Sequence, residues 1–245
     1  MSISGWLHGR KAYLDHINGN KLSGEEKVKE ADAKYRSALA NYAKAAADKN
    51  CAPMYLEAYS VLLMRFQRFD EAMELIRRAD KITRQKADKQ KLRVNYSICL
   101  WKKGKLDQAI ELMKSVFQDR KMGTIYGSLG YMLIEKAEQT GDFTEAEAFN
   151  KEAMTYDDED AVILDNMGQM YLRMGRPEEA LPFFEKAHKF NPKQVDTLYY
   201  LGKLYHEAGR DEEAKEILDH AVIGNYSALC TTTREMAVSL RESIR

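Results

Sequence analysis

The middle of the chain carries apolar residues at the spacing of a helix face. In the segment that begins at Ala161, the side chains of Leu164, Met167 and Tyr171 follow at intervals of three and four residues. This spacing places them on one side of a helix. Gly175 is expected to end that helix, because glycine is readily accommodated at a helix C-terminus.

A second helix is predicted directly afterwards. Pro177 stands in its first turn, where the missing backbone N–H is not needed, and Phe184 and Ala187 lie on its inner face. Pro192 ends it, since proline cannot continue the helical hydrogen bonds. Residues 161–192 are therefore predicted to form a helix–turn–helix unit.

The same pattern recurs at a nearly constant period. Five alanines stand 37, 37, 34 and 34 residues apart, each near the start of a second helix: Ala72, Ala109, Ala146, Ala180 and Ala214. Four of them follow a glycine by five positions: Gly104, Gly141, Gly175 and Gly209. Such self-similarity predicts a repeat array, in which each unit buries surface against its neighbours. Gly168 and Ala180 are expected where antiparallel helices cross closely.

This pattern resembles the tetratricopeptide repeat, whose motif has a large apolar residue, Leu-Gly, Tyr, Gly, Ala, an aromatic residue, Ala and Pro. The matching residues here are Leu164, Met167-Gly168, Tyr171, Gly175, Ala180, Phe184, Ala187 and Pro192. The resemblance covers residues 53–221, with units near 53, 90, 123, 161 and 195. It implies an all-α fold, a right-handed superhelical solenoid of about six helix–turn–helix repeats with a C-terminal capping helix. In the unit near 123, Gly130 and Gly141 are four residues too far apart, which predicts a first helix one turn longer.

The two ends of the chain depart from the motif. Residues 1–52 are expected to form a divergent first repeat, with one helix over 3–18 that Gly19-Asn20 closes and a longer helix over 24–47. Residues 19–24 are interpreted as the loop between them. In residues 222–245, Thr232 followed by Glu235 has the form of a capping box. A last helix is predicted to begin there and to cover the final repeat.

Composition narrows the classes of function. The chain of 245 residues has 38 basic and 38 acidic side chains, so a general attraction to nucleic acid is not expected. Three well-separated cysteines fit a reducing compartment. The sequence has neither a signal-peptide core nor an apolar run of about 20 residues. We expect no direct membrane insertion by this chain, and a location in the cytoplasm or on the cytoplasmic side of a membrane.

The neutral total conceals two regions of opposite charge. Residues 77–121 hold fourteen basic and five acidic side chains, and residues 135–160 hold ten acidic and two basic ones. Aromatic residues do not alternate with the basic ones in the manner of a single-strand binder. Solvated outer faces, or attraction between neighbouring repeats, are favoured over a nucleic-acid site.

No residue pattern indicates catalysis, a metal or a cofactor. The five histidines lack a second His or Cys at metal-ligand spacing. No serine or cysteine has the setting of an activated nucleophile. The acidic run that ends at Asp160 lacks the spacing of a calcium loop, and Asp160 is expected to cap the helix that follows. We therefore expect neither an enzyme nor a cofactor.

The resemblance implies that the first helices line a concave groove, which usually takes an extended peptide or a helix of a partner. Residues beside the packing stripe of these helices are expected to face it: Arg65, Lys91, Val94, Asn95, Ile98, Trp101, Lys102, Tyr131, Asn166, Gln169, Arg173, Tyr199 and Lys203. Asn95 and Asn166 stand where members of the family often bind a ligand's backbone. The carboxylate clamp of the chaperone-binding members is not expected, because Glu57 and Val61 occupy two of its positions.

Val94, Ile98 and Trp101 are apolar where a solvated helix would be polar. They predict an exposed anchor on the groove, ringed by Lys91, Lys102 and Arg65, for a partner segment with acidic and hydrophobic residues. Burial of the three under the first-repeat helices is the alternative.

Two functions stay open. One is a non-enzymatic scaffold that binds a protein or peptide partner in the groove. The other is a homo-oligomeric, self-assembling module, including the soluble part of a membrane-anchored protein, in which the N-terminal pair or the capping helix meets a second copy.

Overall fold

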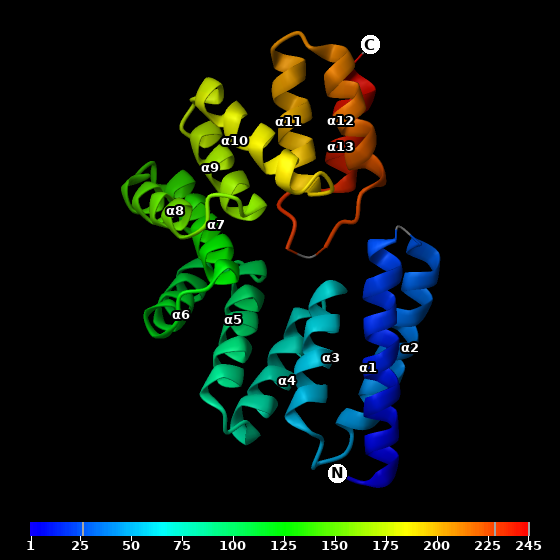
Figure 1. The fold of residues 1–245 in the computed structure, drawn as a ribbon. Coiled ribbons are helices and arrows are strands. Elements are labelled where there is room, and N and C mark those ends of the chain that lie inside the picture. The colour runs from blue at the N-terminus through cyan, green and yellow to red at the C-terminus, as the bar shows by residue number, and fades with distance from the viewer. Residues whose placement is uncertain (26, 228, 245) are drawn as a thin grey trace. The chain divides into compact units, whose positions relative to one another are not determined.

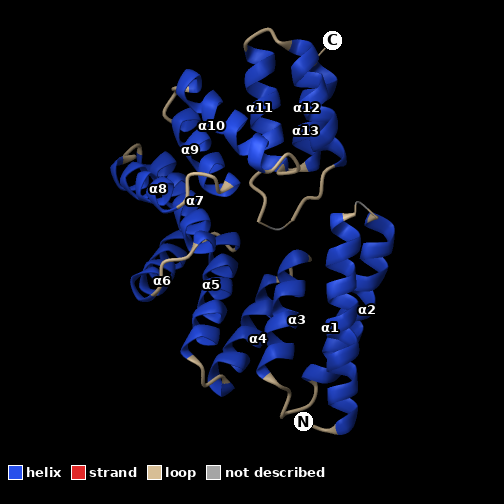
Figure 2. Ribbon diagram, viewed as in Figure 1, coloured by secondary structure: helices blue, strands red, loops and turns tan. Residues whose placement is uncertain are grey.

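The fold consists of helices packed as consecutive pairs. The computed structural model describes residues 1–25, 27–227 and 229–244, which form thirteen helices and, within these ranges, no strand (Figures 1 and 2). The chain divides into two compact units, residues 1–112 and 113–245. The predicted all-α fold of helix–turn–helix pairs is confirmed. The domain boundaries expected at residues 52 and 222 stay predictions.

The first unit contains two long helices, two shorter ones, another long one and the beginning of a sixth. Their bounds are α1 (Ile3–Gly24), α2 (Val28–Ala46), α3 (Pro53–Arg65), α4 (Phe69–Ile82), α5 (Lys86–Lys102) and α6 (Leu106–Asp119). The pairs α1–α2 and α3–α4 make the most extensive contacts in this unit.

The prediction that Gly19-Asn20 closes the first helix was wrong. Helix α1 continues to Gly24, and Gly19 is a packing residue within it. A Cβ atom at Gly19 would lie 2.6 Å from the ring of Tyr35 on α2. The Tyr35 hydroxyl also donates a 2.9 Å hydrogen bond to Asn20 Oδ1. Residues 19–24 therefore form part of a helix pair, and not the predicted loop.

The second unit holds the end of α6 and the remaining helices. Their bounds are α7 (Gly123–Thr140), α8 (Thr144–Tyr156), α9 (Ala161–Arg173), α10 (Pro177–Phe190), α11 (Val195–Glu207), α12 (Asp211–Ile223) and α13 (Arg234–Ser243). Helix α7 has 18 residues and α9 has 13, which agrees with the predicted extra turn. Asp160 caps α9 as expected, since its carboxylate accepts hydrogen bonds from the N–H groups of Val162 and Ile163.

The turns inside the repeats share one backbone conformation. The four predicted turn glycines have φ between 73° and 77°, a left-handed conformation that costs glycine little. In the earlier pair α3–α4, Gln67 takes the same position five residues before Ala72 and has a φ of 57°. The repeat geometry therefore persists where the glycine is missing.

Small residues allow the helices of a pair to approach closely. All five periodic alanines are buried. A Cβ atom at Gly168 would lie 2.8 Å from the ring of Phe184, so the crossing of α9 and α10 depends on glycine at this position. This is the role predicted for Gly168 and Ala180.

Ion pairs join the basic and acidic regions of the second unit. Lys121 lies 2.5 Å from Glu152, and Lys114 lies 2.6 Å from Glu145. These contacts support the interpretation that the regional charges serve attraction between neighbouring repeats.

The last helix packs on the final repeat, as predicted. Ala237 contacts the buried cluster of Leu198 and Ala221, and Ile244 belongs to the cluster of Ala214 and Leu218. The residue that caps this helix is Thr233, which is next to the predicted Thr232.

Thr233, and not Thr232, caps α13, because its side chain accepts the N–H of Met236 at 3.2 Å. Thr232 is buried and forms other hydrogen bonds, described below. Among the helices of the described part of the chain, none is long and apolar enough to cross a membrane.

Candidate partner-binding face

The apolar anchor predicted on α5 is buried. Trp101 is 9% exposed and Ile98 is 5% exposed. The Nζ atom of Lys102 lies 4.0 Å from the centroid of the Trp101 ring and covers it further. The expectation of an open ring was wrong, because burying so large an apolar surface stabilises the fold. Burial under the first-repeat helices, the alternative, stays a prediction, since Val94 is only half-buried.

The other candidates on α5 are more accessible. Lys91 is exposed and pairs with Asp88 at 3.3 Å, while Val94 and Asn95 are half-buried. Without an exposed aromatic ring beside them, these side chains do not form the predicted anchor.

Arg65, at the end of α3, interacts with the N-terminal helix pair. Its guanidinium lies 4.5 Å from the centroid of the Tyr35 ring and donates a 3.2 Å hydrogen bond to the Ser23 hydroxyl. These contacts assign Arg65 a role in holding α1 and α2 against α3.

The second unit brings several predicted residues together. Polar side chains from the first helices of three successive repeats form a connected group, here called the inner polar cluster. It consists of Tyr131 and Glu138 on α7, Asp165, Gln169 and Arg173 on α9, and Asp196, Thr197 and Tyr200 on α11.

Arg173 connects α7 to α9. Its Nε atom is 2.8 Å from a carboxylate oxygen of Glu138, and its Nη2 atom donates to the Tyr131 hydroxyl at 3.1 Å. Its Nη1 atom donates to the side-chain oxygen of Gln169, also at 3.1 Å. Only 14% of the Arg173 side chain is exposed. A charged group so deeply buried requires such partners, so the cluster is held in a defined arrangement.

Asp165 connects α9 to α11. It is 3% exposed, and its carboxylate accepts hydrogen bonds from Thr197 Oγ1 at 2.6 Å and from Gln169 Nε2. Burial, and then the nearby charge of Asp196, raise the pKa of Asp165 to about 7. The two hydrogen bonds and Arg173 act in the opposite direction. Asp165 is therefore a carboxyl group that changes charge near neutral pH.

Asp196, in the first turn of α11, binds a stretch of polypeptide backbone. Its carboxylate accepts the N–H of Thr231 at 3.0 Å, the N–H of Thr232 at 2.8 Å and the hydroxyl of Thr232 at 2.6 Å. These donors belong to the connection between α12 and α13. The face of α11 thus already performs the kind of recognition that a bound peptide would need.

Two predicted site residues take structural roles. Asn166 is 2% exposed, and its Nδ2 atom donates to the backbone oxygen of Gly127 on α7 at 2.8 Å. Its amide therefore holds α9 to α7, where the sequence analysis expected a bond to a ligand. Tyr199 packs against the buried clusters beneath α13. The assignment of Asn166 to a groove was wrong, because repeat packing uses its side chain. The assignment of Tyr199, which is half-buried, stays a prediction.

Lys203 remains accessible. Its side chain is 39% exposed and lies 3.7 Å from Glu207. Because Asp196, Tyr200 and Lys203 are spaced by four and three residues, they share one face of α11. Lys203 thus extends the inner polar cluster along this helix towards solvent.

The sequence analysis missed several members of the cluster. Asp196, Thr197 and Tyr200 were not among the predicted residues, although Asp196 and Tyr200 stand on the face of α11 that also carries Lys203. Reading each first helix for polar residues spaced by three and four would have found them. Thr231 and Thr232 had no such signal, since their position depends on how a connection folds back.

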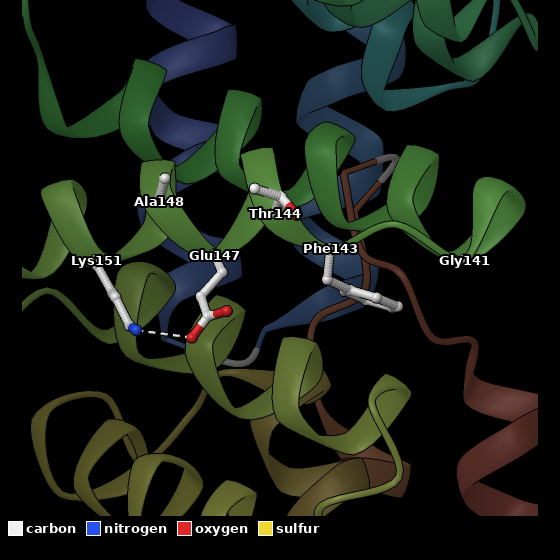
Figure 3. Close-up of a pocket in the computed structure, with 6 residues that line it drawn as sticks. All are labelled: Gly141, Phe143, Thr144, Glu147, Ala148 and Lys151. Carbon is white, nitrogen blue, oxygen red and sulfur yellow. Dashed lines mark ion pairs between the residues drawn. The ribbon is translucent and has the colours of Figure 1, made fainter.

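A depression elsewhere on the second unit has only two charged side chains in its lining. It lies at the start of α8 and is lined by Gly141, Phe143, Thr144, Glu147, Ala148 and Lys151 (Figure 3). Lys151 and Glu147 pair at 2.7 Å within it. Among the described residues, no group of three or more His, Cys, Asp or Glu side chains could hold a metal ion. The inner polar cluster is the stronger candidate for a site.

Residues 171–224, which include the end of α9 and the helices α10 to α12, match the family model of the tetratricopeptide repeat. This stretch consists of tetratricopeptide repeats, and the helix pairs of the whole chain have the fold of tetratricopeptide repeat proteins of known structure. Repeats of this family generally mediate protein–protein interactions, and proteins built from them are typically non-catalytic scaffolds.

Three solved structures, two of them of tetratricopeptide repeat proteins, share the fold. One from Parabacteroides merdae has 14% identity and a TM-score of 0.69, with 92% of this chain and 84% of that one covered. A thermophilic protein from Thermus thermophilus has 18% identity and a TM-score of 0.62, with 78% and 98% covered. The APC/C hetero-tetramer Cut9–Hcn1 has 15% identity and a TM-score of 0.62, with 95% of this repeat protein and 47% of that chain covered. No protein of curated function matches the sequence.

Proposed function

We propose that this tetratricopeptide repeat protein is a non-enzymatic scaffold that binds an extended segment of a partner protein on the inner polar cluster. The observation that carries the proposal is the carboxylate of Asp196, which accepts two consecutive backbone N–H groups and a hydroxyl from the bend at Thr231 and Thr232. A partner segment presents the same groups. The half-buried ring of Tyr131 supplies apolar contact beside it.

The buried part of the inner polar cluster supports the proposal that a partner segment binds there. Arg173 and Asp165 fix the positions of α7, α9 and α11 through hydrogen bonds between their side chains. A site held in place before the ligand arrives loses less conformational entropy on binding. The proposed partner is therefore recognised mainly through its backbone and hydroxyl groups, and the acidic and hydrophobic partner expected from Trp101 is not retained.

A pair of charge reversals tests the location of the site. Peptides selected on the full chain from a random library provide the probe. Lys203→Glu reverses a charge on the face of α11 that carries Asp196, about two turns along the helix. Lys215→Glu is the same change on α12, where Lys215 pairs with Glu212 at 2.9 Å.

We expect Lys203→Glu to change the Kd of the selected peptides at least about fivefold, a free-energy change of about 1 kcal/mol. Lys215→Glu should leave the Kd within twofold. Equal effects of the two variants, or a failure to select any peptide, would contradict the proposal.

A second function is favoured by the outer face of α1. Six large apolar side chains on one side of this helix are exposed: Ile3, Trp6, Leu7, Tyr13, Leu14 and Ile17. Arg10 lies among them, with its guanidinium 5.4 Å from the centroid of the Trp6 ring. A contiguous apolar stripe of this kind marks an interaction surface. We propose self-association through α1 as the alternative, in which the stripe of one copy packs on that of another.

A further inference from the structure

The exposed side of α1, the dark blue helix in Figure 1, carries a heptad pattern. Six exposed residues along its centre, here called the α1 seam, are spaced alternately by four and three positions: Ile3, Leu7, Arg10, Leu14, Ile17 and Lys21. A mean spacing of 3.5 residues keeps one edge of a helix facing a second helix along its length. Four of the six residues are large and apolar, which a helix face turned only to solvent does not require.

The opposite side of α1 packs on the rest of the first unit. A Cβ atom at Gly19 would lie 2.6 Å from the ring of Tyr35 on α2, and one at Gly9 would lie 2.5 Å from the ring of Tyr55 on α3. Ala12, between these glycines, is fully buried. Helix α1 is therefore already folded and held in place, so a partner on the seam does not have to order it, and the entropy cost of binding is smaller.

The seam is positively charged. Its two polar residues, Arg10 and Lys21, are both cations, and it contains no carboxylate. The guanidinium of Arg10 lies beside the Trp6 ring, and Lys21 lies 4.0 Å from Glu25 beyond the end of the seam. These two charges limit how a second copy of α1 can be placed on the first.

A parallel pair of α1 helices brings like charges together. In that orientation each seam residue faces its own counterpart, so Arg10 meets Arg10 of the second copy and Lys21 meets Lys21. Like charges directly opposite one another destabilise an interface. In an antiparallel pair, two residues face each other when their numbers add to a constant, which allows each cation to face an apolar side chain.

One antiparallel register uses the whole seam. When facing residue numbers add to 24, Leu7 faces Ile17, Arg10 faces Leu14 and Ile3 faces Lys21 of the second copy. The long stems of the two cations then cover apolar side chains while their charged ends reach water.

A shift of one heptad in either direction is less favourable. A total of 31 places Arg10 opposite Lys21, and a total of 17 leaves Ile17 and Lys21 without a facing residue. The seam thus complements itself only in the antiparallel register described above. Such self-complementarity is what a two-fold symmetric pair of copies requires.

We propose that α1 pairs with α1 of a second copy in the antiparallel orientation, with Leu7 of each copy against Ile17 of the other. The proposal rests on the self-association named above as the alternative function, and adds the orientation and register of the two copies. The seam rises about 27 Å along the helix, at about 1.5 Å per residue. Trp6 and Tyr13, which are 43% and 39% exposed, flank it on one side and extend the apolar contact.

Disulfide cross-linking of the full chain tests the register. Cys51 and Cys99 are buried, and Cys230 is replaced by serine in every variant. Leu7→Cys, enlarged by a tag, is mixed with untagged Ile17→Cys and oxidised. We expect the mixed product to exceed either homodimeric product at least about tenfold. Two copies of position 7 lie about 15 Å apart along an antiparallel pair, which is beyond the reach of a disulfide.

Ala40→Cys, at an exposed position of α2, is the matched control and should give little product with Leu7→Cys. A predominant product between two Leu7→Cys chains, or equal yields with Ile17→Cys and Ala40→Cys, would overturn the proposed arrangement.

Distances between spin labels give a second measurement, which does not depend on the geometry of a disulfide. Ser4 and Asn18 are exposed beside the seam and tolerate labels. In the antiparallel register, a label on Ser4→Cys lies about 3 Å along the axis from one on Asn18→Cys of the second copy, and about 24 Å from one on Ser4→Cys. We expect the mixed pair to give the shorter distance by at least about 10 Å, and the reverse order would refute the proposal.

The outcomes separate the arrangement from the association itself. A wild-type chain that stays monomeric at all concentrations would contradict both. A dimer with cross-links between two copies of position 7, and with the shorter distance between two labels on Ser4→Cys, would leave self-association in place and show that the antiparallel arrangement is wrong.

Discussion

At the scale of single residues, the buried polar groups of the second unit hold the first helices of three repeats together. Asp165 and Arg173 are almost fully enclosed, and each links two first helices through side-chain hydrogen bonds. Charged groups in such positions are costly unless their partners are complete. Asp165 also faces the negative charge of Asp196, so its protonation should respond to pH in the neutral range.

The stability of the second unit is therefore expected to depend on this carboxyl group. Because burial raises the pKa of Asp165 from 3.8 to about 7, the folded state binds its proton more tightly than the unfolded state does. The free energy of unfolding should then fall as pH rises from about 4 to 7.

Asp165→Asn removes this titration, and comparison with the wild type cancels contributions from other groups. Between pH 5 and pH 8, the free energy of unfolding of the variant should rise by about 1–4 kcal/mol relative to that of the wild type, since one pKa unit corresponds to about 1.4 kcal/mol. Urea denaturation at the two pH values measures it. A stability difference that does not vary with pH would show that Asp165 keeps an ordinary pKa.

At the scale of helices, the sequence pattern predicted most of the array, because packing between helices requires small residues at fixed positions. The close crossing of helices at Gly168 and the longer helix α7 were both predicted from the spacing of the repeats. The prediction failed at Gly19. This glycine allows α2 to pack closely on α1, but the sequence analysis interpreted it as the end of a helix. Local composition does not distinguish a glycine that ends a helix from one that packs inside it.

Helix α1 provides a prediction at this scale. Its outer stripe is apolar, so we expect the wild type to self-associate and its weight-average sedimentation coefficient to rise with concentration. Leu7→Glu combined with Leu14→Glu places charges on two side chains that are 55% and 52% exposed, and should keep the chain monomeric.

Ala40→Glu, at an exposed position of α2, is the matched control and should associate like the wild type. A wild-type chain that is strictly monomeric at all concentrations would contradict the hypothesis of self-association through α1.

At the scale of the whole molecule, the fold followed from the sequence and the site followed only in part. The repeat period predicted helix pairs and a covering last helix, since both depend on local apolar spacing. Trp101 was misassigned because periodicity places a residue on a helix face but does not show what covers that face. The partners of Asp196 could not be predicted, because Thr231 and Thr232 reach α11 through an irregular connection.

The central claim is that a partner segment binds the first-helix face of the second unit. The most direct measurement is photo-crosslinking of a selected peptide to the full chain, with the photoreactive residue benzoylphenylalanine at position 203 on α11 or at position 215 on α12. The account predicts strong cross-linking from position 203, little from position 215, and loss of the product when unlabelled peptide is added. Equal cross-linking from both positions, or cross-linking from position 215 alone, would contradict it.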